Sequence, residues 1–147
     1  MNYAVLSEEL STDPLGRNYA TMTDEEVAAS LAAEDRTRLR PIQSSELLAW
    51  AADGNRLARL ETAAADAGLG AVQSVAKAAI LMIRRDGTTL DLSLNDRANM
   101  LAALVAADVL TQADSDSLVA IGTETLSRAE ELGLGTVRIG SVHQARI

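Results

Sequence analysis

The residues that could carry chemistry in this sequence are few and scattered. The only histidine, His143, lies four residues before the end of the sequence, and termini hold a catalytic base poorly in position. A metal site would need several more ligands, and the sequence contains no cysteine. We therefore interpret His143 as an exposed residue on a terminal turn, and we expect no catalytic and no metal-binding residue.

Pairs of neighbouring acidic residues also occur, as at Glu8 with Glu9 and at Glu130 with Glu131. Catalysis by carboxylates needs two acids that converge in a cleft from distinct elements. Each pair instead lies at the start or on the solvent face of an expected helix, so the pattern gives no reason to predict an enzyme.

The run from Asp114 to Ser117 is similar to the start of a calcium-binding loop. Such a loop needs glycine at its sixth position and glutamate at its twelfth, whereas Val119 and Thr125 stand there. A helix that Thr111 caps explains these residues better. No cofactor is therefore expected.

The composition limits the classes of partner. The 147 residues carry a net charge of −8 and 48% apolar residues, without cysteine or phenylalanine. An acidic surface argues against nucleic acid or a membrane as the main partner, because both are polyanions. The first residues lack the basic region of a secretory signal, so we expect synthesis in a cytoplasm.

The only basic run consists of Arg36, Arg38 and Arg40. These arginines could contact phosphate, but few aromatic residues accompany them. A solvated connection or a strip of salt bridges between subunits fits the run better, and the second alternative makes these three residues candidates for a protein interface.

Apolar residues recur at helical spacing along most of the chain, and the richness in alanine and leucine favours helices. The fold class expected is therefore mainly α, a compact helical domain of seven or eight short helices. The principal helices expected are residues 2–10, 24–35, 56–67, 71–85, 95–110 and 123–132, with others beginning at Ser44 or Ser45 and at Thr111, and Ser141 is expected to cap a last turn.

Two segments are expected to be extended, residues 88–94 because leucine alternates with polar residues there, and the short run 137–139. The helix of residues 71–85 has the widest apolar face, which predicts a central position. We also expect an N-terminal helical arm, residues 1–43, and a helical core, residues 44–147, within one folding unit.

Two stretches of the sequence resemble one family of proteins. Residues 13–22 read Asp-Pro-Leu-Gly-Arg-Asn-Tyr-Ala-Thr-Met, with further matching residues within 3–10 and 23–31. Residues 127–135 read Ser-Arg-Ala-Glu-Glu-Leu-Gly-Leu-Gly, followed by Val137, Gly140, Val142 and the pair Ala145-Arg146. Together they resemble a family of small proteins that tailed bacteriophages and prophages carry among their virion genes.

This resemblance covers both ends of the chain well and the middle poorly. One departure is Leu31-Ala32, where the family commonly has Leu-Asn. The resemblance implies a role in a virion or in its assembly and carries over no catalytic residue.

Three residues in these stretches are further candidates for an interface. Arg17 can bind a carboxylate through two hydrogen bonds, and Tyr19 offers a flat ring with a hydroxyl tip. Alternatively, Arg17 pairs within its own chain and Tyr19 fills the core. Arg128 can pair with Glu131 on one helix face, which would make this part of the chain a structural corner.

Three functions are compatible with these observations. The first is a non-enzymatic structural or adaptor protein of a bacteriophage virion, in the neck, tail or fibre-base region. It would form homo-oligomers, bind other phage structural proteins, and bind neither nucleic acid nor a membrane. The second is a soluble acidic inhibitor or regulatory module that binds a host protein, which requires acids gathered on one face. The third is a small enzyme, which requires a cleft. We expect the first.

Overall fold

The computed structural model describes residues 1–147 and is mainly helical, as expected. Eight helices have eight or more residues, and a ninth has four. The chain forms two compact units. Met1–Arg38 and Thr125–Ile147 make the first, called here the terminal unit, and Leu39–Glu124 make the second, called the inserted unit.

This division differs from the expected boundary between residues 43 and 44. The expected arm, residues 1–43, extends past Arg38, where the first segment of the terminal unit ends. It also lacks the last part of the chain, Thr125–Ile147, which belongs to the same unit. Leu6, Val27 and Leu31 of the arm pack against Ala129 and Val142. Sequence periodicity shows that a helix has an apolar face but not which distant segment covers it.

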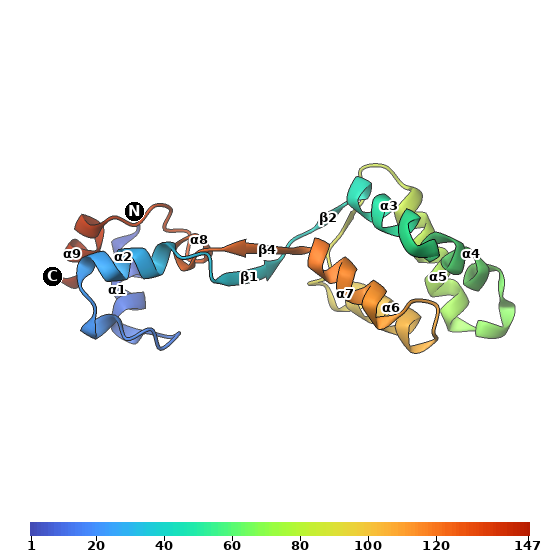
Figure 1. Cartoon of the computed structure of the whole chain (residues 1–147), viewed down its shortest axis with the longest axis horizontal. Coiled ribbons are helices and arrows are strands. Elements are labelled where there is room, and N and C mark those ends of the chain that lie inside the picture. Colours follow the sequence, from blue (N-terminus) through green and yellow to red (C-terminus); the bar gives the residue numbers. More distant parts are fainter. The chain divides into compact units, whose positions relative to one another are not determined.

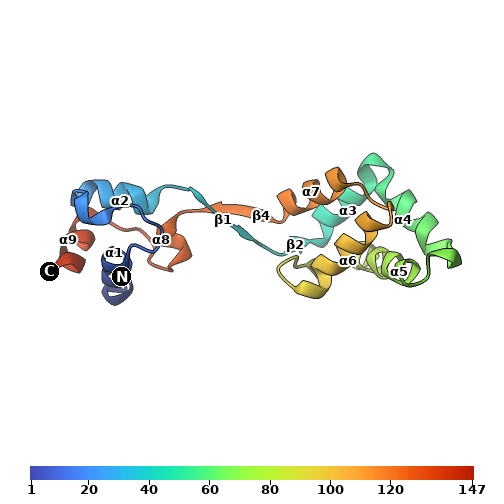
Figure 2. The same cartoon turned by 90° about the horizontal axis from the view of Figure 1, so that it is seen from below.

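The terminal unit contains four helices. Figures 1 and 2 both show α9 beside α1 and α2, and α2 also contacts α8. The helices are α1 (Tyr3–Thr12), α2 (Asp24–Ala32), α8 (Arg128–Glu131) and α9 (Ile139–Arg146), with a 3-10 turn η1 (Tyr19–Thr21). As expected, Thr23 and Glu26 form a capping box that begins α2.

The inserted unit contains five helices, and α5 contacts α3, α4 and α6 (Figure 1). This confirms the central position expected for residues 71–85. The helices are α3 (Ser44–Ala52), α4 (Arg56–Ala65), α5 (Ala71–Arg84), α6 (Asn95–Ala106) and α7 (Gln112–Ile121), with 3-10 turns η2 (Asp53–Asn55) and η3 (Ala67–Leu69). Thr111 caps α7, as expected, by accepting the N–H of Asp114.

Four short strands form two small sheets. The strands β1 (Arg36–Leu39) and β4 (Thr123–Leu126) make one sheet. The strands β2 (Ile42–Gln43) and β3 (Thr89–Leu90) make the other, which is antiparallel and pairs Ile42 with Leu90. The extended segment expected at residues 88–94 is therefore only two residues long, because Asp91 and Ser93 form a turn after it.

The prediction of a helix at residues 123–132 is wrong for the first half of that range. Residues 123–126 form β4, and only Arg128–Glu131 are helical. Threonine alternates with other residues at Thr123 and Thr125, and β-branched residues favour strands. Ser127 then caps α8 by accepting the N–H of Glu130.

The end of the chain also differs from expectation. The run 137–139 was expected to be extended, but α9 already begins at Ile139, because the carbonyl of Arg138 accepts the N–H groups of Ser141 and Val142. Other helices end earlier than expected. The helix expected to reach residue 110 ends at Ala106, and Asp108 follows it with a φ of 56°.

Each unit has its own hydrophobic core. The terminal unit buries Leu6, Tyr19, Val27, Leu31, Ala129, Leu134, Val137 and Val142. The inserted unit buries a larger set that includes Trp50, Leu60, Ile80 and Leu104. Two cores explain how one chain forms two compact units. No helix is both long enough and apolar enough to cross a membrane.

Candidate interaction site

Arg17 and Tyr19 turn inward in the terminal unit. The guanidinium of Arg17 donates hydrogen bonds to the carbonyl and hydroxyl of Ser30 and to Asp35, at 2.5, 3.2 and 2.7 Å. Tyr19 is fully buried, and burial raises the pKa of its hydroxyl. The intramolecular alternative for Arg17 and Tyr19 is therefore the one that the structure has.

Arg128 also binds within its own unit. Its guanidinium donates two hydrogen bonds, of 2.9 and 2.7 Å, to the carboxylate of Glu9, which is 4% exposed. It donates a third to Glu131 at 2.8 Å. Glu131 accepts hydrogen bonds from Arg36 as well, at 3.0 and 3.4 Å. The hydrogen bonds from Arg36 and Arg128 lower the pKa of Glu131 to about 2.

The other two arginines of the basic run lie on opposite sides of the unit boundary. Arg38, on β1, lies in the terminal unit and adds to the lowering of the pKa of Glu130, after the hydrogen bonds that Ser127 donates. Arg40 lies in the inserted unit and donates two hydrogen bonds to Glu46, at 3.0 and 2.7 Å. These bonds, with one from the backbone of Gln43, lower the pKa of Glu46 to about 2.

The structure thus brings Arg36 and Arg128 together on Glu131. It places Tyr19 in the core of the same unit, binds Arg17 to Ser30 and Asp35 there, and places Arg40 in the other unit. Most of these side chains already bind carboxylates or carbonyl groups of their own unit. A surface that is free to bind a partner lies elsewhere.

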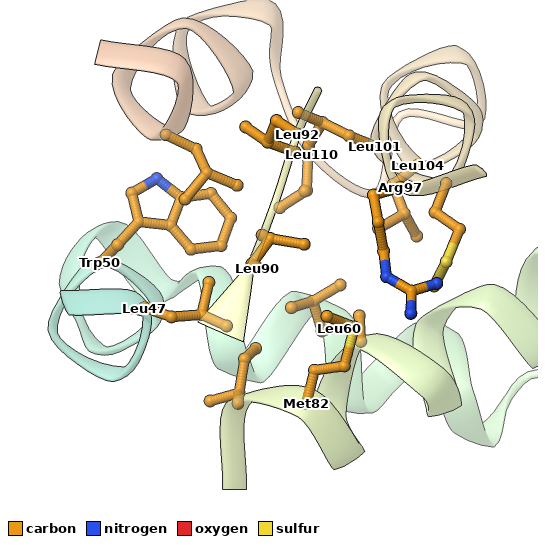
Figure 3. A pocket seen from close by; sticks show the side chains of 14 residues that line it. Leu47, Trp50, Leu60, Met82, Leu90, Leu92, Arg97, Leu101, Leu104 and Leu110 are labelled. Atoms are coloured by element: carbon orange, nitrogen blue, oxygen red, sulfur yellow. The ribbon is translucent and has the colours of Figure 1, made fainter. Parts of the chain in front are cut away.

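An apolar pocket in the inserted unit provides such a surface. Its cavity volume is about 50 Å³, and 13 of its 14 lining side chains are apolar, the exception being Arg97. Figure 3 shows Trp50 and Arg97 on opposite sides of the pocket, with Leu90 between them. The lining comes from α3, α4, α5, β3, α6 and α7 together with Leu92 and Leu110.

The pocket opens between α5 and α6. The lining residues that remain partly exposed all belong to these two helices, and they are Ala79, Met82, Arg97, Met100 and Leu101. The remaining lining residues are buried. Two of the side chains at the mouth are methionines, whose flexible thioethers adapt to different contacts.

A polar network fixes the wall that Trp50 provides. The indole N–H donates to the hydroxyl of Ser117 at 2.9 Å, and the guanidinium of Arg56 lies 5.1 Å from the ring centroid. Arg56 and Arg59 both bind the carboxylate of Asp114, at 2.9 and 2.7 Å. The indole ring is therefore held by its polar edge while its apolar face lines the pocket.

Asp114 is a buried carboxylate that stays charged. Burial raises its pKa, but the hydrogen bonds from the backbone of Thr111 and from Arg56 and Arg59 outweigh that effect, so its pKa lies well below the usual range. Its role is structural, because it completes the capping box of α7 by accepting the backbone N–H of Thr111 and holds two arginines of α4 in place.

Near the end of the chain, Nδ1 of His143 lies 3.3 Å from the carboxylate of Asp24, and the side chain is largely exposed. Arg146 binds the same carboxylate and the carbonyls of Tyr19 and Met22. This cluster joins α9 to the start of α2. No group of three or more histidine and carboxylate side chains lies close enough together to hold a metal ion.

Sequence reasoning missed the pocket and the network of Asp114. One indication of the network was present, because Thr111 followed by Asp114 is the pattern of a capping box. The two arginines that complete it stand more than 50 residues earlier in the chain, and no local pattern links them to Asp114.

Comparisons with protein-family models, with curated protein sequences and with solved structures find no match to this chain.

Proposed function

We propose that this chain is a non-enzymatic structural or adaptor protein of a bacteriophage virion, in the neck, tail or fibre-base region. It acts through contacts with other phage structural proteins and as a homo-oligomer. The observation that carries the contact function is the open apolar pocket between α5 and α6. A partner that covers apolar side chains at an open mouth removes them from water, which favours binding.

The distribution of the motifs supports the phage assignment. Both stretches that resemble the phage family belong to the terminal unit, whereas the inserted unit coincides with the middle of the chain, where the resemblance is poor. We infer that the terminal unit is the part common to such proteins and that the inserted unit recognises the particular partner.

The ion pairs support the structural function over the alternative, an acidic inhibitor that imitates nucleic acid. That alternative needs unpaired acids on one face. At least nine of the 21 acidic side chains instead bind arginine or histidine of the same chain, among them Glu9, Asp24, Glu46, Asp114 and Glu131.

Two measurements test this function. Light scattering gives the mass of the purified chain in solution, and mass spectrometry of gradient-purified phage particles shows whether the chain is part of them. We expect a discrete oligomer, and the chain in particles at a constant ratio to the other virion proteins across the gradient. A strict monomer that is absent from particles would contradict the proposal and favour the inhibitor.

A further inference from the structure

Three of the seven basic residues of the inserted unit lie on or just after α5. No acidic residue occurs between Asp66 and Asp86, whereas Lys77, Arg84 and Arg85 do, in a chain whose net charge is −8. This segment is therefore locally basic, and it differs in sign from most of the molecule.

Two of these cations have no partner. Lys77 and Arg85 are the only basic residues of the inserted unit without a carboxylate within 4 Å, since the other five all form ion pairs. Both side chains are exposed. Their charge is therefore available to a partner, unlike that of Arg40, Arg56 or Arg59.

An exposed leucine lies among these cations. Leu81 is 69% exposed, the highest value among the large apolar side chains of this unit. It follows Lys77 by four residues in α5, so the two share one helix face. A large apolar side chain between unpaired cations is typical of a contact surface and is costly to leave in water.

This face borders the mouth of the pocket. Met82, a partly exposed lining residue, directly follows Leu81 and lies about 100° further round the helix, at the edge of the exposed face, and Arg85 lies about one turn further along. Arg97 reaches the pocket from α6 (Figure 3). Basic side chains therefore stand on both helices that form the mouth, with an apolar cavity between them.

The cavity sets the size of what can enter. Its volume of about 50 Å³ is one third of the ~150 Å³ of an engineered cavity that binds benzene. The pocket therefore accepts the end of one aliphatic side chain and is too small for a drug-sized ligand, which needs ~300 Å³ or more.

We propose that Lys77, Leu81, Arg85 and the mouth of the pocket, together called here the α5 surface, bind an acidic segment of a partner protein that inserts one leucine side chain into the pocket. The inference rests on the proposed contact function and names the chemistry of the partner. Carboxylates of the segment pair with Lys77, Arg85 and Arg97. Arg97 leaves its ion pair with the exposed Asp96 and forms one with the partner.

The chain carries its own reporter for this binding. Trp50 is the only tryptophan and lines the pocket, so its fluorescence responds to what fills the cavity. The probes are three blocked pentapeptides, Glu-Glu-Leu-Glu-Glu and two relatives, one with glutamine in place of every glutamate and one with alanine in place of leucine.

We expect the first peptide to give a saturable change in Trp50 emission. The alanine peptide should bind about tenfold more weakly, since it cannot fill the cavity, and the glutamine peptide more weakly as well. No saturable change, or equal binding of all three peptides, overturns the proposal. This comparison uses the unaltered full chain and does not depend on the folding of any variant.

Variants then locate the charges. The double substitution Lys77→Gln with Arg85→Gln should weaken binding of the first peptide about five- to tenfold, whereas the control Arg138→Gln, which removes one exposed arginine of the terminal unit, should leave it unchanged. An equal loss of affinity in the double variant and in the control would show that only the net charge matters, and it would overturn the α5 surface as the binding site.

A further variant tests the cavity. Ala79→Leu should fill the pocket and remove the preference for leucine over alanine while keeping the preference for glutamate. A preference for leucine that survives in folded Ala79→Leu protein contradicts insertion. If the peptides do not bind as expected but the chain is present in particles, only the α5 surface is overturned. If the peptides bind as expected but the chain is absent from particles, only the virion function is overturned.

Discussion

Arg128 of α8 binds Glu9 of α1 through two hydrogen bonds of 2.9 and 2.7 Å, across 119 positions of sequence. Glu9 is 4% exposed and the Arg128 side chain 13%. This buried ion pair joins the two ends of the chain into one unit. The terminal unit therefore depends on a contact between the first helix and residues that follow the inserted unit.

Removal of one partner of this pair should destabilise the terminal unit. Glu9→Ala leaves the guanidinium of Arg128 buried without its main partner, which costs about 3–5 kcal/mol of unfolding free energy. Urea unfolding followed by circular dichroism measures the loss. The control Glu8→Ala removes an exposed carboxylate without a side-chain partner and should change the free energy by less than about 0.5 kcal/mol.

The same experiment distinguishes the two units. Trp50 emission reports only the inserted unit, because that unit contains the single tryptophan. We expect Glu9→Ala to leave the midpoint of the Trp50 transition unchanged. A shift of both transitions by the same amount would show that the two cores unfold as one.

Acid should weaken the terminal unit through Glu131. Its pKa falls from the ordinary 4.5 to about 2 in the folded chain, because Arg36 and Arg128 donate hydrogen bonds to its carboxylate. The resulting stabilisation is fully present above pH 4.5 and is lost as the pH falls through 2. Glu131→Gln should therefore be less stable than the natural chain at pH 6, and the difference should narrow towards pH 2.

Urea midpoints of both proteins, measured by circular dichroism at several pH values across this range, test the prediction. A constant difference between the two proteins would mean that Glu131 titrates alike in the folded and unfolded chains.

Asp114 should be essential for the inserted unit. Asp114→Ala removes one half of the capping box at the start of α7 and leaves two guanidiniums without their shared carboxylate, for a total loss of about 3 kcal/mol or more. Trp50 emission during urea unfolding measures it. Asp116→Ala, an exposed acid of the same helix, is the matched control, and equal effects of the two substitutions would contradict the role of the network.

Gly122 should not tolerate a side chain. A Cβ at this position would stand 3.0 Å from two carbon atoms of Ile42, which is fully buried. Gly122→Ala should cost about 1–3 kcal/mol through overpacking. Gly140→Ala, within α9 and with open space around its Cβ, should be neutral or stabilise by up to about 1 kcal/mol. The reverse order in thermal unfolding midpoints would show that Ile42 is free to move aside.

Local patterns predicted the local structure well. Thr23 and Thr111 mark helix starts because each can accept an N–H within one turn, and the apolar face of α5 gave its central position. The strand β1 was missed because Arg36, Thr37, Arg38 and Leu39 carry no apolar alternation, and their extended conformation depends on pairing with β4, which stands more than 80 residues later.

Long-range pairing also explains what the sequence did not reveal about the site. Arg17 and Tyr19 looked suited to an interface because their residue types occur there, yet their partners Ser30, Asp35 and Glu9 are chosen by the fold. No pattern in the sequence distinguishes Lys77 and Arg85 from the other basic residues. They become notable only because the structure gives the other cations of their unit partners and leaves these two without.

The contact function is tested most directly at Lys77, which is the only lysine of the chain and lies on the α5 surface. Carbodiimide treatment of purified phage particles joins an amine to a carboxylate that already touches it, and mass spectrometry identifies the attached peptide. We expect Lys77 to be joined to an aspartate or glutamate of another virion protein, and we expect Lys77→Arg to abolish the link. Particles that contain the chain but leave Lys77 unlinked, or particles without the chain, would contradict the contact function.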